Sequence, residues 1–297
     1  MLTIQSNTTL IDVIEAVNEA LEKADVYFGH GSDNAWDESV AIVLQALKIP
    51  HNEAHQSQDR ILTEDEMSKV NHLLERRIVE RKPLAYLTNE AYFFGLPFYV
   101  DERVIVPRSP IAELIERQFS PWVNPEKVTN ILDMCTGSAC IAIACAFAFE
   151  YAAVDAVDID TDALAVAKIN VEKHKVDQQV NLIQSNVFEN VPKKKYDLIV
   201  SNPPYVCQEE MDVIPKEYLQ EPKLALHAED EGLFIVEEIL SKAFDYLSDD
   251  GVLVVEVGNS QEALEKRYPE VPFLWLDFAN GGDGVFLLEK QHASYFG

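Results

Sequence analysis

The sequence predicts an α/β fold, in which helices cover both faces of an open, mostly parallel sheet, preceded by a small helical domain. Hydrophobic residues recur at helical spacing near the N-terminus, and from residue 129 onward short apolar runs alternate with helical patterns. The glycine-rich turn Asn280–Gly284, between β-type runs at 273–277 and 285–289, predicts a terminal antiparallel hairpin. We expect a helical domain over 1–83, a β-hairpin linker over 84–106 and the sheet domain over 107–297.

Length and composition limit the possible classes of protein. With 297 residues and 47% hydrophobic content, the chain can build two domains with proper cores. Its apolar runs are shorter than a membrane span, and Met1-Leu-Thr-Ile-Gln-Ser6 lacks the basic-then-apolar pattern of a signal peptide. We therefore expect a cytoplasmic protein with no membrane partner.

The charge balance is strongly acidic, with 24 basic against 51 acidic residues and a net charge of -27. A field of this sign repels phosphate backbones, so we expect no direct nucleic-acid binding, and it attracts a basic protein. The acidity can equally serve solubility alone. Because the four cysteines form no CxxC pair and the seven histidines form no HExxH motif, we expect reduced packing cysteines and no metal site.

Three amphipathic helices are predicted in the N-terminal region. They span about 8–24, 35–48 and 63–81, and Pro50 ends the second. The third opens on Thr63-Glu-Asp-Glu66, the pattern of a capping box, in which the end residues satisfy each other's backbone N–H groups. Their apolar faces indicate packing, and nothing in them suggests chemistry.

Residues 84–106 change character, because aromatic and β-branched residues flank Gly95 and Pro97 and favour a β-hairpin. Pro107-Arg-Ser-Pro110 then opens a helix over about 109–119. Beyond it, the strands and helices alternate as in parallel sheets. We expect strands at 129–134, 153–158, 180–185, 196–201, 251–257, 273–277 and 285–289, and helices at 138–149, 161–174, 230–247 and 260–267.

The first predicted strand ends in the tight loop Asp133-Met-Cys-Thr-Gly137, which precedes a helix. Parallel sheets bind ligands at such carboxyl ends, and Gly137 lets a ligand approach the backbone, although the loop lacks the glycines of a full GxGxxG fingerprint. Asp158 ends the second strand, where a carboxylate can accept hydrogen bonds from both ribose hydroxyls. Alone, Asp158 fits a helix N-terminal charge equally well. Together with the loop, it favours an adenosine-containing cofactor.

The fourth predicted strand runs into Asn202-Pro203-Pro204-Tyr205. Alone, a Pro-Pro pair after a strand is a stiff turn, because each proline fixes its own φ and restricts the residue before it. If the Asn202 side-chain carbonyl and the Pro203 backbone carbonyl accept hydrogen bonds from a planar NH₂ group, they hold a poor nucleophile in place, and Tyr205 can stack on it. A sulfonium methyl group delivered in line then needs no metal and no covalent nucleophile.

Over nearly its whole length, the chain resembles the HemK/Prm family of S-adenosylmethionine-dependent methyltransferases, which modify protein glutamine. The resemblance is carried by KPLAYL (82–87), FYVDERVIVPRS (98–109), DMCTGSA (133–139), VDAVDID (154–160), SNPPY (201–205) and GGDGVF (281–286). Within the family, the chain is most similar to the PrmB type, which methylates a glutamine of ribosomal protein uL3. The NPPY motif alone is shared with adenine and guanine methyltransferases, whereas the other motifs are more specific.

The resemblance implies a class I methyltransferase fold, a Rossmann-like seven-stranded sheet with a terminal antiparallel hairpin, over the catalytic domain 107–297. It implies a substrate-recognition role for the helical domain, S-adenosylmethionine as cofactor, and methylation of the side-chain N5 of a glutamine in uL3, a basic ribosomal protein. The implied catalytic residues are Asn202, Pro203, Pro204 and Tyr205, and the implied cofactor-binding residues are Asp133, Met134, Cys135, Thr136, Gly137, Asp158, Asn186, Val187 and Asn202.

Two positions depart from the family pattern. Ala139 replaces a usual glycine, so we expect a methyl group to intrude near the cofactor, and Asn186 replaces a usual acidic residue, so we expect a weaker grip on the adenine amine. Three alternative functions stay open: glutamine methylation of a translation release factor, amino-methylation of a nucleic acid, and a non-catalytic role in ribosome assembly after erosion of the cofactor site at these two positions.

Overall fold

The computed structural model describes residues 8–296, and the chain divides into two compact units. The helical unit comprises Met1–Glu90 and Pro215–Gln220, and the sheet unit comprises Ala91–Ile214 and Glu221–Gly297. Within the described residues, no helix is long and apolar enough to cross a membrane. The assignment of recognition, linkage and catalysis to 1–83, 84–106 and 107–297 stays a prediction.

The helical unit is built around one apolar core. Its helices are α1 (Leu10–Lys23), α2 (Ala35–Leu47), the short α3 (Ala54–Ser57), α4 (Glu64–Val79) and the short α5 (Leu84–Thr88). Helices α1 and α4 both begin with a capping box, at Thr9 and Thr63. Their buried faces meet that of α2, and the shared core includes Val13, Ile42 and Val70.

Residues 84–88 form a helix rather than the start of the predicted hairpin. Pro83 stands at the N-cap of α5, and the following Leu84, Ala85 and Tyr86 are all buried. Three successive buried side chains suit a packed helical turn, because a strand at a surface would alternate. The hairpin itself follows as β1 (Ala91–Phe93) and β2 (Leu96–Phe98).

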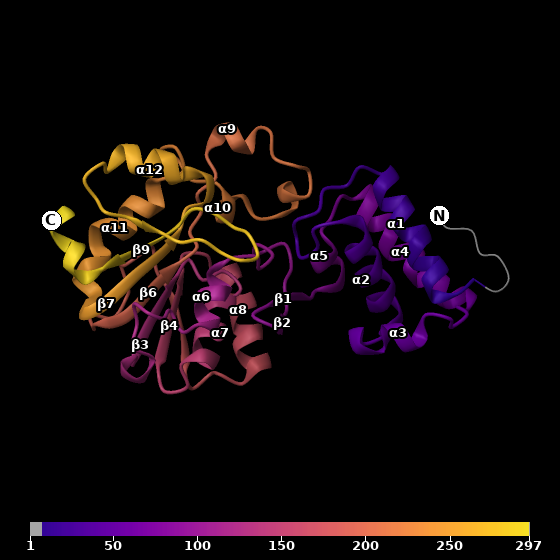
Figure 1. Cartoon of the computed structure of the whole chain (residues 1–297), viewed down its shortest axis with the longest axis horizontal. Helices are drawn as coiled ribbons and strands as arrows, with labels where there is room; N and C mark the ends of the chain where they lie inside the picture. The colour runs from indigo at the N-terminus through magenta and orange to yellow at the C-terminus, as the bar shows by residue number, and fades with distance from the viewer. Residues whose placement is uncertain (1–7, 297) are drawn as a thin grey trace. The chain divides into compact units, whose positions relative to one another are not determined.

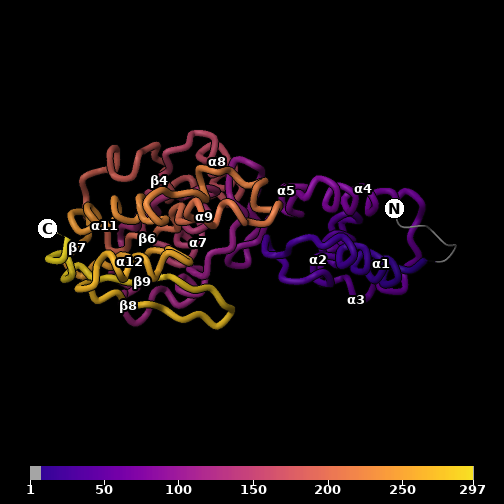
Figure 2. Tube along the Cα trace, turned by 90° about the horizontal axis from the view of Figure 1, so that it is seen from above, coloured from indigo at the N-terminus to yellow at the C-terminus, as the bar shows by residue number. Residues whose placement is uncertain are grey.

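The sheet unit contains a seven-stranded sheet of order β5-β4-β3-β6-β7-β9-β8. Its strands are β3 (Asn130–Met134), β4 (Ala153–Asp158), β5 (Val180–Gln184), β6 (Tyr196–Ser201), β7 (Leu247–Glu256), β8 (Leu274–Trp275) and β9 (Val285–Glu289). Strands β3 to β7 pair in parallel, and β9 runs antiparallel to both β7 and β8. The predicted fold class is confirmed, and Figure 2 shows β4 and β8 toward opposite edges of this sheet.

Helices cover both faces of the sheet (Figure 1). One face carries α6 (Ile111–Glu116), α7 (Cys140–Ala148) and α8 (Thr161–His174), and the other carries α11 (Phe234–Tyr246) and α12 (Gln261–Arg267). Side chains of β3 alternate between these layers: Leu132 and Met134 join the core beneath α11, whereas Asp133 accepts a hydrogen bond from the Ala142 N–H of α7. The connection from β6 to α11 contains the short helices α9 (Gln208–Met211) and α10 (Lys223–Leu226), which the sequence did not predict.

Candidate active site

The carboxyl ends of three neighbouring strands bring the predicted motifs together. Strand β3 lies between β4 and β6, with Met134 opposite Val157 on one side and opposite Ser201 on the other. The chain runs from β3 through β4 to β5, then returns to β6 on the other side of β3, so the strand order reverses at this point. Open parallel sheets bind ligands at such a switch point. Asp158 and Asn202 therefore flank the loop that follows Met134.

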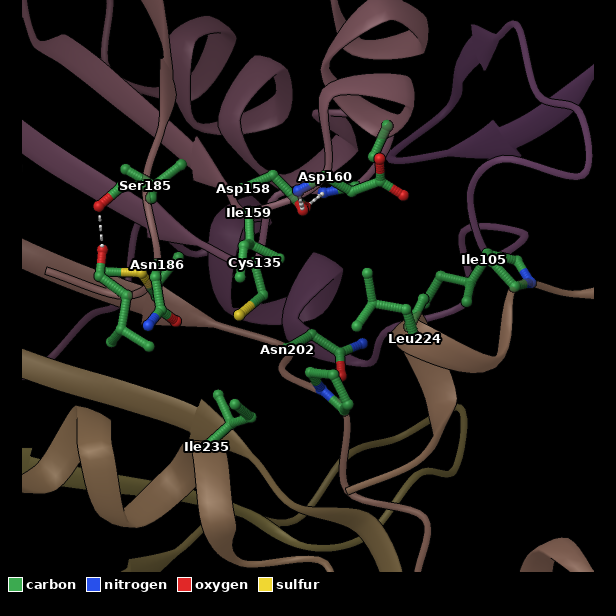
Figure 3. Close-up of a pocket in the computed structure, with 18 of the residues that line it drawn as sticks. Ile105, Cys135, Asp158, Ile159, Asp160, Ser185, Asn186, Asn202, Leu224 and Ile235 are labelled. Carbon is green, nitrogen blue, oxygen red and sulfur yellow. Dashed lines mark hydrogen bonds between the residues drawn. The ribbon is translucent and has the colours of Figure 1, made fainter. Parts of the chain in front are cut away.

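A pocket opens at this switch point (Figure 3). The predicted residues that line it are Met134, Cys135, Gly137, Asp158, Asn186, Val187, Asn202 and Pro204. Among the described residues, the lining does not include Asp133, Thr136, Pro203 or Tyr205. Figure 3 shows Asp158, Asn186 and Asn202 around the same open space, with Ile235 of α11 beside it.

Asp133 lies beneath the loop rather than in the pocket. Its side chain is completely buried, and its Oδ2 accepts hydrogen bonds from Thr136 Oγ1 and from the Ala142 N–H at 3.0 Å. Its Oδ1 has no hydrogen-bond partner within residues 8–296. Burial raises the pKa of Asp133 to about 7, although the two hydrogen bonds lower it. Asp133 therefore supports the loop and keeps one oxygen without a protein donor.

Asp158 organises the two loops that border the pocket. Its Oδ2 accepts the Gly137 N–H at 2.8 Å, and its Oδ1 accepts the Asp160 N–H at 2.9 Å (Figure 3). Burial raises the pKa of Asp158, while these backbone hydrogen bonds lower it. Since each carboxylate oxygen can accept a second hydrogen bond, Asp158 can bind two hydroxyl groups of a ligand while holding both loops.

The two departures from the family pattern act differently from each other. Ala139 is buried outside the pocket lining, at the N-cap of α7, and has a φ of 64°. Its methyl group therefore strains the backbone, because the left-handed region disfavours any residue with a Cβ. Contrary to the expectation from the sequence, this methyl group does not intrude on the pocket. Asn186 does line the pocket, and its Nδ2 donates to Glu189 Oε1 at 3.2 Å.

The side-chain amide of Asn202 has no hydrogen-bond partner among the described residues. Its side chain is partly exposed in the pocket and forms no hydrogen bond with any residue of the described range 8–296. The backbone carbonyl of the buried Pro203 likewise accepts no hydrogen bond within that range. Tyr205, in contrast, is anchored away from the pocket, where its hydroxyl donates to Glu256 Oε1 at 2.9 Å. The Asn202 side-chain carbonyl is thus free to accept a hydrogen bond from a ligand in the pocket. The Pro203 carbonyl has no donor among residues 8–296 and belongs to a residue outside the pocket lining.

Sequence reasoning missed the apolar walls of the pocket. They include Ile105, Ile159, Leu224 and Ile235. Arg103, which pairs with Asp101 at 2.6 Å, also lines the pocket, and the FYVDERVIVPRS run was the one signal for it. Residues 222–227 carry no periodic pattern, so only the tertiary fold shows that they reach the site.

In the part of the chain that the structure describes, no group of three His, Cys, Asp or Glu side chains is placed to hold a metal ion.

The sheet order, the terminal antiparallel strands and the pocket at the switch point define a class I methyltransferase. A family model for the methyltransferase small domain matches residues 119–271. The catalytic domain of hMettl16, solved in complex with a MAT2A 3'UTR hairpin, has a similar fold, with a TM-score of 0.52 at 16% identity over 83% of this chain and 88% of that chain.

Two curated relatives extend over almost the whole chain. The ribosomal protein uL3 glutamine methyltransferase of Francisella tularensis is 49% identical over 94% of this chain and 90% of its own length. The protein of the same name from Bordetella pertussis is 47% identical over 97% of each chain. The chain belongs to this family of glutamine methyltransferases, and the resemblance seen in the sequence is confirmed.

Proposed function

We propose that the protein transfers a methyl group from S-adenosylmethionine to the side-chain N5 of a glutamine in ribosomal protein uL3. The names of two relatives, at 47% and 49% identity over most of the chain, support the substrate. The Asn202 side-chain carbonyl, which lines the pocket and accepts no hydrogen bond from residues 8–296, supports the chemistry, and it is the observation that carries the proposal. A ribosomal-protein substrate supports a cytoplasmic location for the proposed reaction.

The lining of the pocket suits S-adenosylmethionine. Asp158 offers one further acceptor direction on each carboxylate oxygen, as the two ribose hydroxyls require. Ile159, Val187 and Ile235 offer apolar surface to the purine ring, and Asn186 offers an amide at its edge. When bound, the cofactor supplies a sulfonium methyl group as the electrophile.

Asn202 and Pro203 hold the nucleophile in this mechanism. A glutamine amide nitrogen is a poor nucleophile, because its lone pair is delocalised into the carbonyl group. The Asn202 side-chain carbonyl and the Pro203 backbone carbonyl each accept a hydrogen bond from the substrate NH₂, which fixes the nitrogen and stabilises the positive charge that builds on it. One of the amide protons then leaves to water. The rigid Pro203-Pro204 backbone loses little entropy on binding.

The charge of the protein fits a basic partner. A net charge of -27 attracts the Lys- and Arg-rich surface of a ribosomal protein and repels free nucleic acid. We assign recognition of this partner to the helical unit, whose described residues carry no predicted catalytic or cofactor-binding position.

The test compares the parent protein with Asn202→Ala on purified uL3, and tandem mass spectrometry locates the added methyl group. We expect the parent to methylate one glutamine and the variant to lose about 100-fold or more in kcat/KM. Calorimetry is expected to show that the variant still binds S-adenosylmethionine, so that the loss of turnover is assigned to the contact with the substrate amide. Full activity of Asn202→Ala would overturn the mechanism.

Parallel reactions separate the alternative functions. Preferential methylation of a release-factor glutamine would show that the release factor, rather than uL3, is the substrate. Salt-sensitive binding and methylation of RNA or DNA would favour a nucleic-acid amino group. Failure to bind S-adenosylmethionine at millimolar concentration would favour the non-catalytic assembly role.

A further inference from the structure

Glu256, at the end of β7, joins two motifs that lie far apart in the sequence. It is only 6% exposed, and both of its carboxylate oxygens accept hydrogen bonds from hydroxyl groups. Tyr205 Oη donates to Oε1 at 2.9 Å, and Ser109 Oγ donates to Oε2 at 2.5 Å. When Glu256 is ionised, its carboxylate can only accept, so both hydroxyl groups donate to it.

Residues that follow Glu256 hold Tyr205 at further points. A Cβ added to Gly258 would lie 2.5 Å from Cε2 of the Tyr205 ring, so the ring rests against bare backbone there. Ser260 Oγ lies 3.0 Å from the Tyr205 carbonyl oxygen. A Cβ on Gly232 would come within 2.2 Å of the same oxygen, so Gly232 makes room for it. We call Glu256, Gly258 and Ser260 the Tyr205 cradle.

The C-terminal GGDGVF motif supports this cradle through the backbone. The Val257 N–H donates to the Gly284 carbonyl oxygen at 2.6 Å. A Cβ on Gly284, whose φ is 69°, would lie 2.1 Å from the Gly258 carbonyl oxygen. Only glycine at 284 therefore allows the two backbones to approach this closely. Through the cradle, the end of the chain contacts the segment that carries Asn202.

The pKa of Glu256 is raised above its ordinary value, because burial outweighs the contacts that favour the charged form. Burial raises the pKa of Glu256, whereas the hydrogen bonds from Ser109 and Tyr205 and the positive charge of Arg108 lower it. Arg108 is itself paired with Glu221 at 2.6 Å. In the described chain, Glu256 does not line the pocket, so it can reach the reaction only through its neighbours.

We propose that Glu256 is a positioning residue for methyl transfer, acting through the Tyr205 hydroxyl to hold Asn202–Tyr205 in the geometry that presents the substrate amide. This inference rests on the proposed function of Asn202 and Pro203. Loss of Glu256 slows turnover, because Asn202–Tyr205 is then held less firmly. It leaves cofactor binding intact, because Glu256 lies outside the pocket.

The test is a double-mutant cycle between Glu256→Ala and Tyr205→Phe, with Glu256→Gln as the conservative variant. Loss of a charged hydrogen bond predicts a drop in kcat of roughly 10- to 100-fold for Glu256→Ala, and a similar drop for Tyr205→Phe. The double variant is expected to be no slower than the slower single variant. Glu256→Gln, which keeps an acceptor for the tyrosine and can donate to Ser109, is expected to retain activity within about fivefold of the parent.

Three further readouts make the outcome decisive. Affinity for S-adenosylhomocysteine is expected to change less than about twofold, because the cradle does not touch the pocket. The proposal would be overturned if the fold-loss in kcat of the double variant equalled the product of the two single losses. A Glu256→Gln variant as slow as Glu256→Ala would also overturn it. Should Glu256→Ala fail to fold, Tyr205→Phe carries the test, and a kcat within about twofold of the parent in that variant would overturn the proposal.

Hydrogen exchange separates this inference from the proposed function. We expect the peptide that carries 202–206 to exchange faster in Glu256→Ala and in Tyr205→Phe, even without any substrate. A parent protein that methylates neither uL3 nor another substrate would overturn the proposed function alone. Unchanged hydrogen exchange in both variants would overturn the positioning role of the Tyr205 cradle, whatever the substrate.

Discussion

Asp158 connects the loop after β3 with the loop after β4, because its two oxygens accept the Gly137 and Asp160 N–H groups. The same oxygens are the proposed ribose acceptors. Asp158→Ala is therefore expected to weaken S-adenosylmethionine binding roughly 10- to 100-fold, the range for lost hydrogen bonds to a charged group. Isothermal titration calorimetry measures this change, with the exposed Asp177→Ala as a control of unchanged affinity. Equal affinity in Asp158→Ala and the parent would contradict the ribose assignment.

Asp133 gives the cofactor-free protein a pH-dependent stability. Its pKa of about 7 in the folded protein exceeds the ordinary value of 3.8, so between these pH values the folded state binds more protons than the unfolded state. The free energy of unfolding must then fall as pH rises through this window, by an amount on the order of 4 kcal/mol at most from a shift of this size.

Asp133→Asn removes this titration while nearly keeping the side-chain shape. Urea unfolding at pH 5 and pH 8 is expected to show a smaller loss of stability with rising pH in the variant than in the parent. Parallel pH dependences in the two proteins would show that Asp133 does not hold its proton in the folded state.

At the scale of elements, α7 begins under strain. Ala139 at its N-cap has a φ of 64°, which costs a residue with a Cβ about 1–2 kcal/mol. Ala139→Gly removes the strain and a buried methyl group together, so stability is expected to change by less than about 1 kcal/mol. Ala144→Gly, in the interior of the same helix and equally buried, is expected to lose about 1–2 kcal/mol. Thermal denaturation compares them, and an equal loss in both variants would contradict the strain at Ala139.

The regular elements follow from local sequence patterns, and the irregular ones do not. The apolar run of β6 and the capping box at Thr63 predict their elements, because burial on a strand and satisfaction of helix N–H groups are local requirements. Helix α5 escaped prediction because its buried aliphatic and aromatic residues suit a strand equally well. The link from Tyr205 to Glu256 spans 51 residues, so no local pattern signals it.

At the scale of the whole molecule, the chain leaves the sheet unit after β6 and contributes Pro215–Gln220 to the helical unit. Glu217 in this segment is completely buried. Its Oε1 lies 3.2 Å from Arg77 Nη1 and 2.9 Å from Arg81 Nε, and it accepts the Tyr27 N–H at 3.1 Å. The segment downstream of Asn202–Tyr205 is thus part of the helical unit and is held there by the buried Glu217.

Glu217→Ala leaves the buried Arg77 with one carboxylate fewer, and a broken buried ion pair costs about 3–5 kcal/mol. Hydrogen exchange is expected to rise in α2 and α4, while β3 and β6 keep their protection. The exposed Glu209→Ala, eight positions earlier in the same connection, is expected to change stability by less than about 0.5 kcal/mol. Unchanged protection of α4 in Glu217→Ala would show that the segment does not stabilise the helical unit.

Methylation of uL3 by this protein can be tested by mass spectrometry of ribosomal proteins from cells that contain the protein and from cells that lack it. We expect one N5-methylglutamine in uL3 that disappears without the protein, returns with the parent gene and does not return with Asn202→Ala. An unmodified uL3 in both kinds of cell, or a methyl group that persists without the protein, would contradict the proposed function.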